Sequence, residues 1–208
     1  LNDTILPNAA EDANNPEIAN IPLVQLIGGS GAPYDQVFQN TGFTYDDLVT
    51  PQGLNEIALY AEGIGPSKTR IVPLNTVDLD NNGQPDDING DGVISDGDRF
   101  IGEATTLVDD AHEEGLQVHP YTFRSDEFYL PASYNGNPEL EYELFTQIGV
   151  DGFFSDFPDV AVSATEKFTA DYVSSPDNPE GNIANLPRSR GFEGMAYSPD
   201  RTTLYPLL

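Results

Sequence analysis

The stretch NPELEYELFTQIGVDGFFSDF (137–157) decides the fold class, because a helix, a glycine and an apolar run follow one another directly. An Asn-Pro pair is typical of a helix start, and Gly149 is typical of a helix end. The run VDGFFSDF (150–157) then predicts a strand. Apolar residues recur at every fourth position of the helix, at Leu140, Leu144 and Ile148. Helix, glycine and buried strand in this order indicate a parallel α/β protein.

The same pattern occurs earlier in the chain. PLVQLIG (22–28) predicts a buried strand. Thr50 and Pro51 offer an N-cap and a first helical residue. The apolar face of that helix consists of Leu54, Ile57, Ala58 and Ala61. A strand followed by a helix is therefore the first unit of the chain.

A further unit lies between these two. Leu107, Val108 and Ala111 mark a helix that ends at Gly115, and LQVHPYTF (116–123) follows as a strand. A weaker fourth strand is expected at 63–65 or at 71–74. Four parallel strands can form half of an eight-stranded barrel or part of an open sheet. Spacing alone leaves both architectures open.

The composition after about residue 170 differs from that of the α/β part. Residues 171–187 are rich in Pro, Asn, Ser and Asp and indicate a linker. In residues 188–208, the turn signal SPDR lies between two short runs of β-type residues. We expect the beginning of an all-β unit there.

The charge balance excludes several partners. The chain carries 8 Lys and Arg against 35 Asp and Glu, a net charge of −27, so nucleic acid and anionic membranes would repel it. Without cysteine, disulfides and thiolate metal sites are excluded. No apolar run is long enough for membrane insertion, and the polar start shows no signal peptide. Such a start fits a fragment that continues upstream.

An acidic insertion at 71–103 contains the most specific motif, DINGDGVISDGD (87–98). Alternate oxygen-bearing side chains around a glycine turn are the pattern of a calcium loop. The upstream run 78–86 repeats the opening of this pattern, so two overlapping loops can share ligands. The expected structural Ca²⁺ ligands are Asp78, Asp80, Asn82, Gln84, Asp87, Asn89, Asp91, Val93, Ser95 and Asp98. A disordered acidic linker is the alternative.

Few residues outside this insertion indicate chemistry. His119 lies in a predicted strand whose carboxyl end would face an active site in a barrel, Arg124 lies just past that strand, and Asp156 lies at the end of the predicted strand 150–157. Lys68 and Arg124 are candidate anchors for an anionic group such as phosphate, although surface ion pairs explain them equally well. His112 is expected on a helix in a packing or surface role.

Three strings resemble the glycerophosphodiester phosphodiesterase family: YAEGIGPSK (60–68), VHPYTFR (118–124) and GVDGFFSDFPD (149–159). This resemblance implies a TIM (β/α)8 barrel, of which residues 1–170 would form the C-terminal half. It also implies hydrolysis of glycerophosphodiesters to glycerol 3-phosphate and an alcohol, with a divalent metal and two histidines as acid and base.

The sequence departs from the family in one respect. The HRG-like, HD-like and E-x-K-like strings of the first half-barrel, which carry the catalytic histidines and metal ligands, do not occur in it. No catalytic residue is therefore expected here, and the fragment should be inactive without the rest of its polypeptide. The resemblance implies the following substrate-facing residues: Lys68, His119, Tyr121, Arg124, Asp156 and Phe157. The catalytic metal would belong to the complete parent protein.

The tail RGFEGMAYSPDRTTLYPLL (190–208) resembles the start of a phytase-like (esterase-like) β-propeller domain. This implies a multidomain, extracellular or periplasmic parent. A non-catalytic, calcium-dependent binding or adhesion module on a barrel scaffold is the competing hypothesis. If the barrel is correct, the acidic insertion lies on the rim that carries the active site, where calcium would order the mouth of the pocket.

Overall fold

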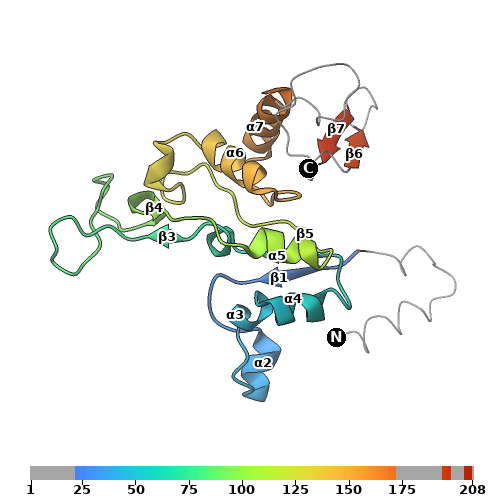
Figure 1. The fold of residues 1–208 in the computed structure, drawn as a ribbon. Helices are drawn as coiled ribbons and strands as arrows, with labels where there is room; N and C mark the ends of the chain where they lie inside the picture. Colours follow the sequence, from blue (N-terminus) through green and yellow to red (C-terminus); the bar gives the residue numbers. More distant parts are fainter. Residues whose placement is uncertain (1–21, 172–193, 198–203, 208) are drawn as a thin grey trace.

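The computed structural model describes residues 22–171, 194–197 and 204–207 (Figure 1). The helices are α2 (Tyr34–Gln39), α3 (Tyr45–Leu48), α4 (Pro51–Ile57), α5 (Leu107–Glu113), α6 (Glu139–Ile148) and α7 (Pro158–Asp171). The strands are β1 (Val24–Ile27), β2 (Gly63–Pro66), β3 (Leu74–Asn75), β4 (Phe100–Ile101), β5 (Gln117–Val118), β6 (Gly194–Tyr197) and β7 (Leu204–Leu207). No helix in this described part is long and apolar enough to cross a membrane.

A parallel sheet with the strand order β1-β2-β5 forms the centre of the α/β part. Ile27, Ile64 and Val118 are fully buried in the same core cluster as Leu54 and Ile57 of α4. Thr50 caps α4 as predicted, because its side-chain oxygen accepts a hydrogen bond from the Gly53 N–H. The predicted mixed α/β fold is confirmed, and of the two placements for the weaker strand the first corresponds to β2.

The segment after α6 differs from its prediction. Residues 150–157 form no regular strand but run beside β5 in an extended path, with one bridge between Phe123 and Ser155. The Asp151 N–H donates to the Val118 carbonyl at 2.9 Å, and the Phe154 N–H donates to the Pro120 carbonyl at 3.0 Å. Pro120 has no N–H with which to continue the ladder, so the segment after β5 and residues 150–157 lose regular pairing there.

The apolar residues of α6 are buried to different degrees, and Leu144 and Ile148 are partly buried against the core. Leu140 is 39% exposed, whereas Tyr142 and Phe145 are each 1% exposed. Both rings surround Phe123, with centroids 5.0 Å away in each case. Tyr142 and Phe145 are therefore the most deeply buried residues of α6, through aromatic packing onto the segment that follows β5.

The acidic insertion leaves this body as a projecting arm (Figure 1). Strands β3 and β4 pair antiparallel at its base, so Leu74 belongs to the arm, whereas Ile71 and Val72 are buried in the core cluster of the body. At the other end of the chain, β6 and β7 pair antiparallel, in agreement with the two β-type runs. The predicted linker and the SPDR turn lie outside the described residues.

Candidate substrate-binding pocket

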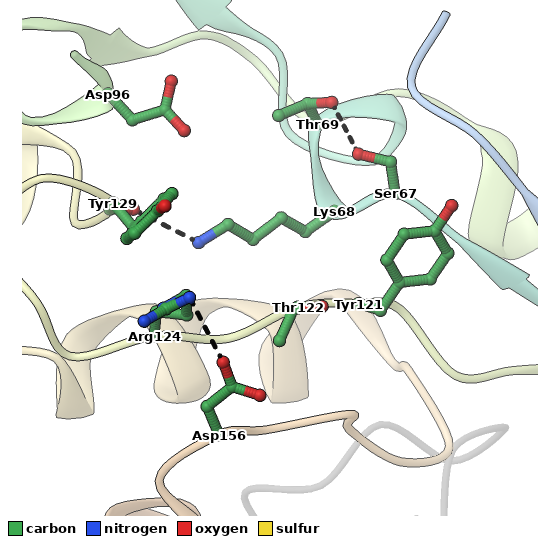
Figure 2. A pocket seen from close by; sticks show the side chains of 9 residues that line it. All are labelled: Ser67, Lys68, Thr69, Asp96, Tyr121, Thr122, Arg124, Tyr129 and Asp156. Carbon is green, nitrogen blue, oxygen red and sulfur yellow. Dashed lines mark hydrogen bonds and ion pairs between the residues drawn. The ribbon is translucent and has the colours of Figure 1, made fainter.

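A pocket of about 370 Å³ opens just beyond the end of β2, beside the segment that follows β5 (Figure 2). Ser67 and Tyr121 form a parallel bridge just beyond the two strands, and the Lys68 N–H donates to the Tyr121 carbonyl at 2.8 Å. The lining residues are Ser67, Lys68, Thr69, Asp96, Tyr121, Thr122, Arg124, Tyr129 and Asp156. The carboxyl ends of parallel strands are where α/β barrels bind their ligands.

Lys68 enters this pocket from a short 3₁₀ turn, Lys68–Arg70, that follows β2. Its Nζ donates to Glu141 Oε1 at 2.7 Å, and the two side chains are only 10% and 3% exposed. Nζ also lies 5.6 Å from the centre of the Phe123 ring. Burial raises the pKa of Glu141, and the nearby Lys68 opposes that rise. The second oxygen of Glu141 is buried without a partner among the described residues.

Arg124 provides the second cation of the pocket. Its Nε donates to Asp126 Oδ2 at 3.0 Å, and its NH1 group lies 3.4 Å from Asp156 Oδ2. The guanidinium stacks on Tyr129, 4.3 Å from the ring centre. The hydrogen bond to Asp126 is the main reason that the pKa of Arg124 is raised. Two carboxylates and an aromatic ring thus hold the planar, permanently charged group at the pocket wall.

The acidic insertion contributes a wall residue that its motif did not predict. Asp96 lines the pocket opposite the cations and pairs with Arg99 at 2.9 Å. The 3₁₀ turn Asp96–Asp98 is joined to the body because the Gly97 N–H donates to the Phe128 carbonyl at 3.3 Å. The rim position predicted for the insertion therefore has a direct structural counterpart.

Two predicted substrate-facing residues are not among the pocket lining. His119 lies two residues before Tyr121, and its ring is packed so close to Gly152 that a Cβ there would approach its Cδ2 to 2.6 Å. Burial lowers the pKa of His119, and its Nδ1 has no hydrogen-bond partner in the described structure. Phe157 directly precedes α7, where its N–H donates to Ser155 Oγ at 2.9 Å.

His112 and Asp151 form a contact outside the pocket, and His112 thus has the packing or surface role expected for it. His112 Nε2 lies 2.9 Å from Asp151 Oδ2, which also accepts from the Val118 N–H at 2.7 Å. This carboxylate ties α5 to the start of the segment beside β5. Neither residue lines the pocket.

The acidic insertion holds its own backbone through side-chain oxygens. The Asp87 carboxylate accepts hydrogen bonds from the N–H groups of Gly90 at 2.7 Å and Gly92 at 2.8 Å. Asp78 accepts from the Gly83 N–H at 2.9 Å, so the upstream run repeats the arrangement. Gly83 and Gly92 have φ values of 82° and 86°, which glycine adopts without strain. The turns that the calcium pattern requires are present in both runs.

Asp98, one of the predicted calcium ligands, lies buried inside the insertion. Its Oδ1 accepts from the N–H groups of Ile88 at 2.8 Å and Asn89 at 3.2 Å, and its Oδ2 accepts from the N–H and hydroxyl of Ser95. The side chain is buried; burial raises its pKa, but these hydrogen bonds outweigh burial and lower it. Asp98 thus accepts from four donors on its two oxygens in this structure.

Within the described residues, no group of three or more Asp, Glu, His or Cys side chains lies close enough to hold a metal ion. A calcium site in the described residues would therefore need amide, hydroxyl and backbone oxygens besides carboxylates.

A parallel α/β sheet whose pocket lies beyond the carboxyl ends of its strands is compatible with a TIM-barrel-like protein, which binds its ligands at that edge. Residues 9–160 match the glycerophosphoryl diester phosphodiesterase family, and the chain belongs to that family. The TIM-barrel-like α/β fold of the family agrees with the parallel sheet seen here.

Several characterised proteins are similar in sequence. Identity is 37% over 120 residues with glycerophosphodiester phosphodiesterase GDPD6 of Arabidopsis thaliana, which covers 57% of this chain and 26% of that protein. It is 28% over 147 residues with the glycerophosphodiester phosphodiesterase of Haemophilus influenzae, covering 69% of this chain and 34% of that protein. The chain therefore spans about a quarter to a third of the length of these relatives.

Proposed function

We propose that the chain is part of a glycerophosphodiester phosphodiesterase that releases glycerol 3-phosphate and an alcohol, with the phosphate of the substrate bound at the pocket beside β2 and β5. The observation that carries this proposal is the presence of Lys68 and Arg124 in one pocket at the carboxyl ends of parallel strands. Charge-assisted hydrogen bonds from such cations stabilise a phosphodiester and the negative charge that develops during its hydrolysis.

In this proposal the chain supplies the last four strands of the barrel and the rest of the polypeptide supplies the others. Strand β1 is the edge of the sheet, and Val24 and Leu26 are 38% and 55% exposed on the face that they share with Gly63 and Gly65. Upstream strands would cover this open edge and close the barrel.

The missing half would also supply the histidine acid–base pair and the ligands of a divalent metal. Such a metal would stabilise the charge on the phosphoryl oxygens when bound. Lys68 and Arg124 would orient the diester toward it. On this proposal the chain is inactive without the remainder of the polypeptide.

The test is hydrolysis of glycerophosphocholine by the complete protein, with release of glycerol 3-phosphate as the readout. Arg124→Ala should lower kcat/KM by about 100-fold, because a preorganised cation at the phosphate is lost. Lys167→Ala removes an exposed cation that pairs with Glu139 outside the pocket, and it should leave kcat/KM unchanged. Unchanged kcat and KM in Arg124→Ala would remove this residue from the site.

We further propose that the acidic insertion binds structural calcium through Asp87, Asn89, Asp91 and their upstream counterparts. The support is the loop conformation around Gly83 and Gly92 and the alternation of oxygen ligands. Asp98 would remain an internal hydrogen-bond acceptor, so the site would have one ligand fewer than its motif predicts.

Titration calorimetry with millimolar Ca²⁺ tests this second proposal. Heat of binding is expected for the unaltered protein and is expected to be lost in Asp87→Ala. The absence of heat in the unaltered protein would end the calcium proposal. If Asp87→Ala and Asp91→Ala bind no calcium yet keep full activity, calcium does not shape the pocket.

The resemblance of residues 190–208 also supports the proposal of a propeller module and of an extracellular or periplasmic location.

A further inference from the structure

The pocket contains both signs of charge, and this arrangement restricts its ligand. Asp96 and Asp156 lie on opposite sides of the two cations in Figure 2, with Lys68 and Arg124 between them. A site built only for a phosphate has no use for Asp96, because a carboxylate facing an anionic ligand weakens its binding.

The charged residues of the pocket and their direct ion-pair partners carry no net positive charge. Lys68 is neutralised by Glu141, and Arg124 contacts both Asp126 and Asp156. Among the described residues Asp96 forms an ion pair with Arg99, whose side chain is 38% exposed. The pocket and its direct partners thus contain more carboxylates than cations. A zwitterion suits such surroundings better than an ester with a neutral or anionic alcohol does.

An aromatic ring lies at the same end of the pocket as Asp96. Tyr129 is 37% exposed, and its ring lies between Asp96 and Arg124 in Figure 2. A carboxylate next to an accessible aromatic ring forms a binding environment for an ammonium group.

On the basis of the proposed function, we propose that this pocket selects glycerophosphodiesters whose alcohol is a cationic amino alcohol, and that Asp96 is the specificity-determining residue. The phosphate lies at Lys68 and Arg124, and the ammonium group lies at Asp96 and Tyr129. In the reaction, water adds its oxygen to phosphorus, the bond from phosphorus to the amino alcohol breaks, and a proton from water goes to the departing oxygen. The acidic insertion is then part of the substrate site.

The test compares kcat/KM of the complete protein for glycerophosphocholine and for glycerophosphoglycerol, whose alcohol is neutral. The unaltered protein should prefer the choline ester. Asp96→Asn keeps the size of the side chain but removes its charge, and it should lower the choline-to-glycerol ratio of kcat/KM by about tenfold. Arg99→Gln removes the competing partner of Asp96 and should raise the same ratio.

Glu143→Gln removes an exposed carboxylate of α6 that does not line the pocket, and it should leave the ratio unchanged. Equal losses on both esters in Asp96→Asn, or no preference for choline in the unaltered protein, would overturn the specificity assignment while leaving the hydrolase proposal intact. Hydrolysis of neither ester would contradict the proposed function and this inference together.

Discussion

The barrel segment (22–70 and 104–157) and the acidic arm (71–103) keep their backbones in place by different means. The barrel segment buries apolar side chains such as Ile27, Ile64 and Phe123 to zero exposure. In the arm beyond residue 72, every buried side chain is polar, and carboxylates accept hydrogen bonds from nearby N–H groups instead. The stability of the barrel segment should therefore depend on packing, and that of the arm on charge and hydrogen bonds.

The largest contrast is expected for apolar truncation in the two regions. Phe123 contacts Tyr142, Phe145 and Phe153 with ring centroids about 5 Å away, so Phe123→Ala should lower the free energy of unfolding by about 3–5 kcal/mol. Leu79 in the arm is 74% exposed, so Leu79→Ala should change it by less than about 0.5 kcal/mol. Urea unfolding measures both; similar losses would show that the arm also depends on apolar burial.

The second effect concerns the buried ion pair below the pocket. Glu141→Gln leaves Lys68 without its carboxylate and should lower the free energy of unfolding by about 3 kcal/mol. The double variant Lys68→Met with Glu141→Gln should recover part of this loss, since no buried charge remains unpaired. A double variant as unstable as the sum of the single variants would show that the pair does not interact in this way.

The third effect tests hydrogen bonding in the arm. Asp98→Asn keeps the shape but cannot accept all four donors, and about 1–3 kcal/mol of local stability should be lost. Amide hydrogen exchange at Ile88 and Ser95 should become faster, with no change at Ile64 in β2. The exposed Asp91→Asn is the matched control and should alter exchange less. If the two variants exchange alike, Asp98 is not the central acceptor.

The smallest effect is the pH dependence from His119. Burial lowers its pKa in the folded state, so the unfolded chain binds a proton more readily, and folded stability should fall as pH drops below about 6.5. This contribution is fully present above pH 6.5. Urea midpoints measured between pH 7 and pH 5 should show a smaller decline in His119→Gln. An identical decline would assign the pH dependence to other groups.

Short sequence patterns predicted those features of the fold that depend on residues close together in the sequence. The cap at Thr50, the buried face at Leu54 and Ile57, and the glycine end of α6 at Gly149 follow from residues only a few positions apart. The spacing of Leu140, Leu144 and Ile148 did not indicate that Tyr142 and Phe145 are the most buried residues of α6, because these two rings pack on Phe123 beyond β5.

The pocket was only partly predictable for the same reason. Lys68, Tyr121, Arg124 and Asp156 were expected from strand ends and family resemblance, and all four line the pocket. The roles of two further residues depend on contacts between positions far apart in the sequence. Glu141 pairs with Lys68, 73 positions away, and Asp96 lines the pocket because the acidic arm folds back onto the body. The local sequence indicated neither role. Asp96 lies in a stretch, 71–98, that contains no Lys or Arg to suggest an ion pair, and Glu141 lies on a predicted helix with no partner nearby in sequence.

The most direct test is a crystal structure of the complete protein with glycerol 3-phosphate. The expected result is a phosphate group in the pocket between Lys68 and Arg124, with oxygen atoms within hydrogen-bond distance of the Arg124 guanidinium. A phosphate bound elsewhere, with the space between Lys68 and Arg124 free of ligand, would contradict the assignment of this pocket as the substrate site.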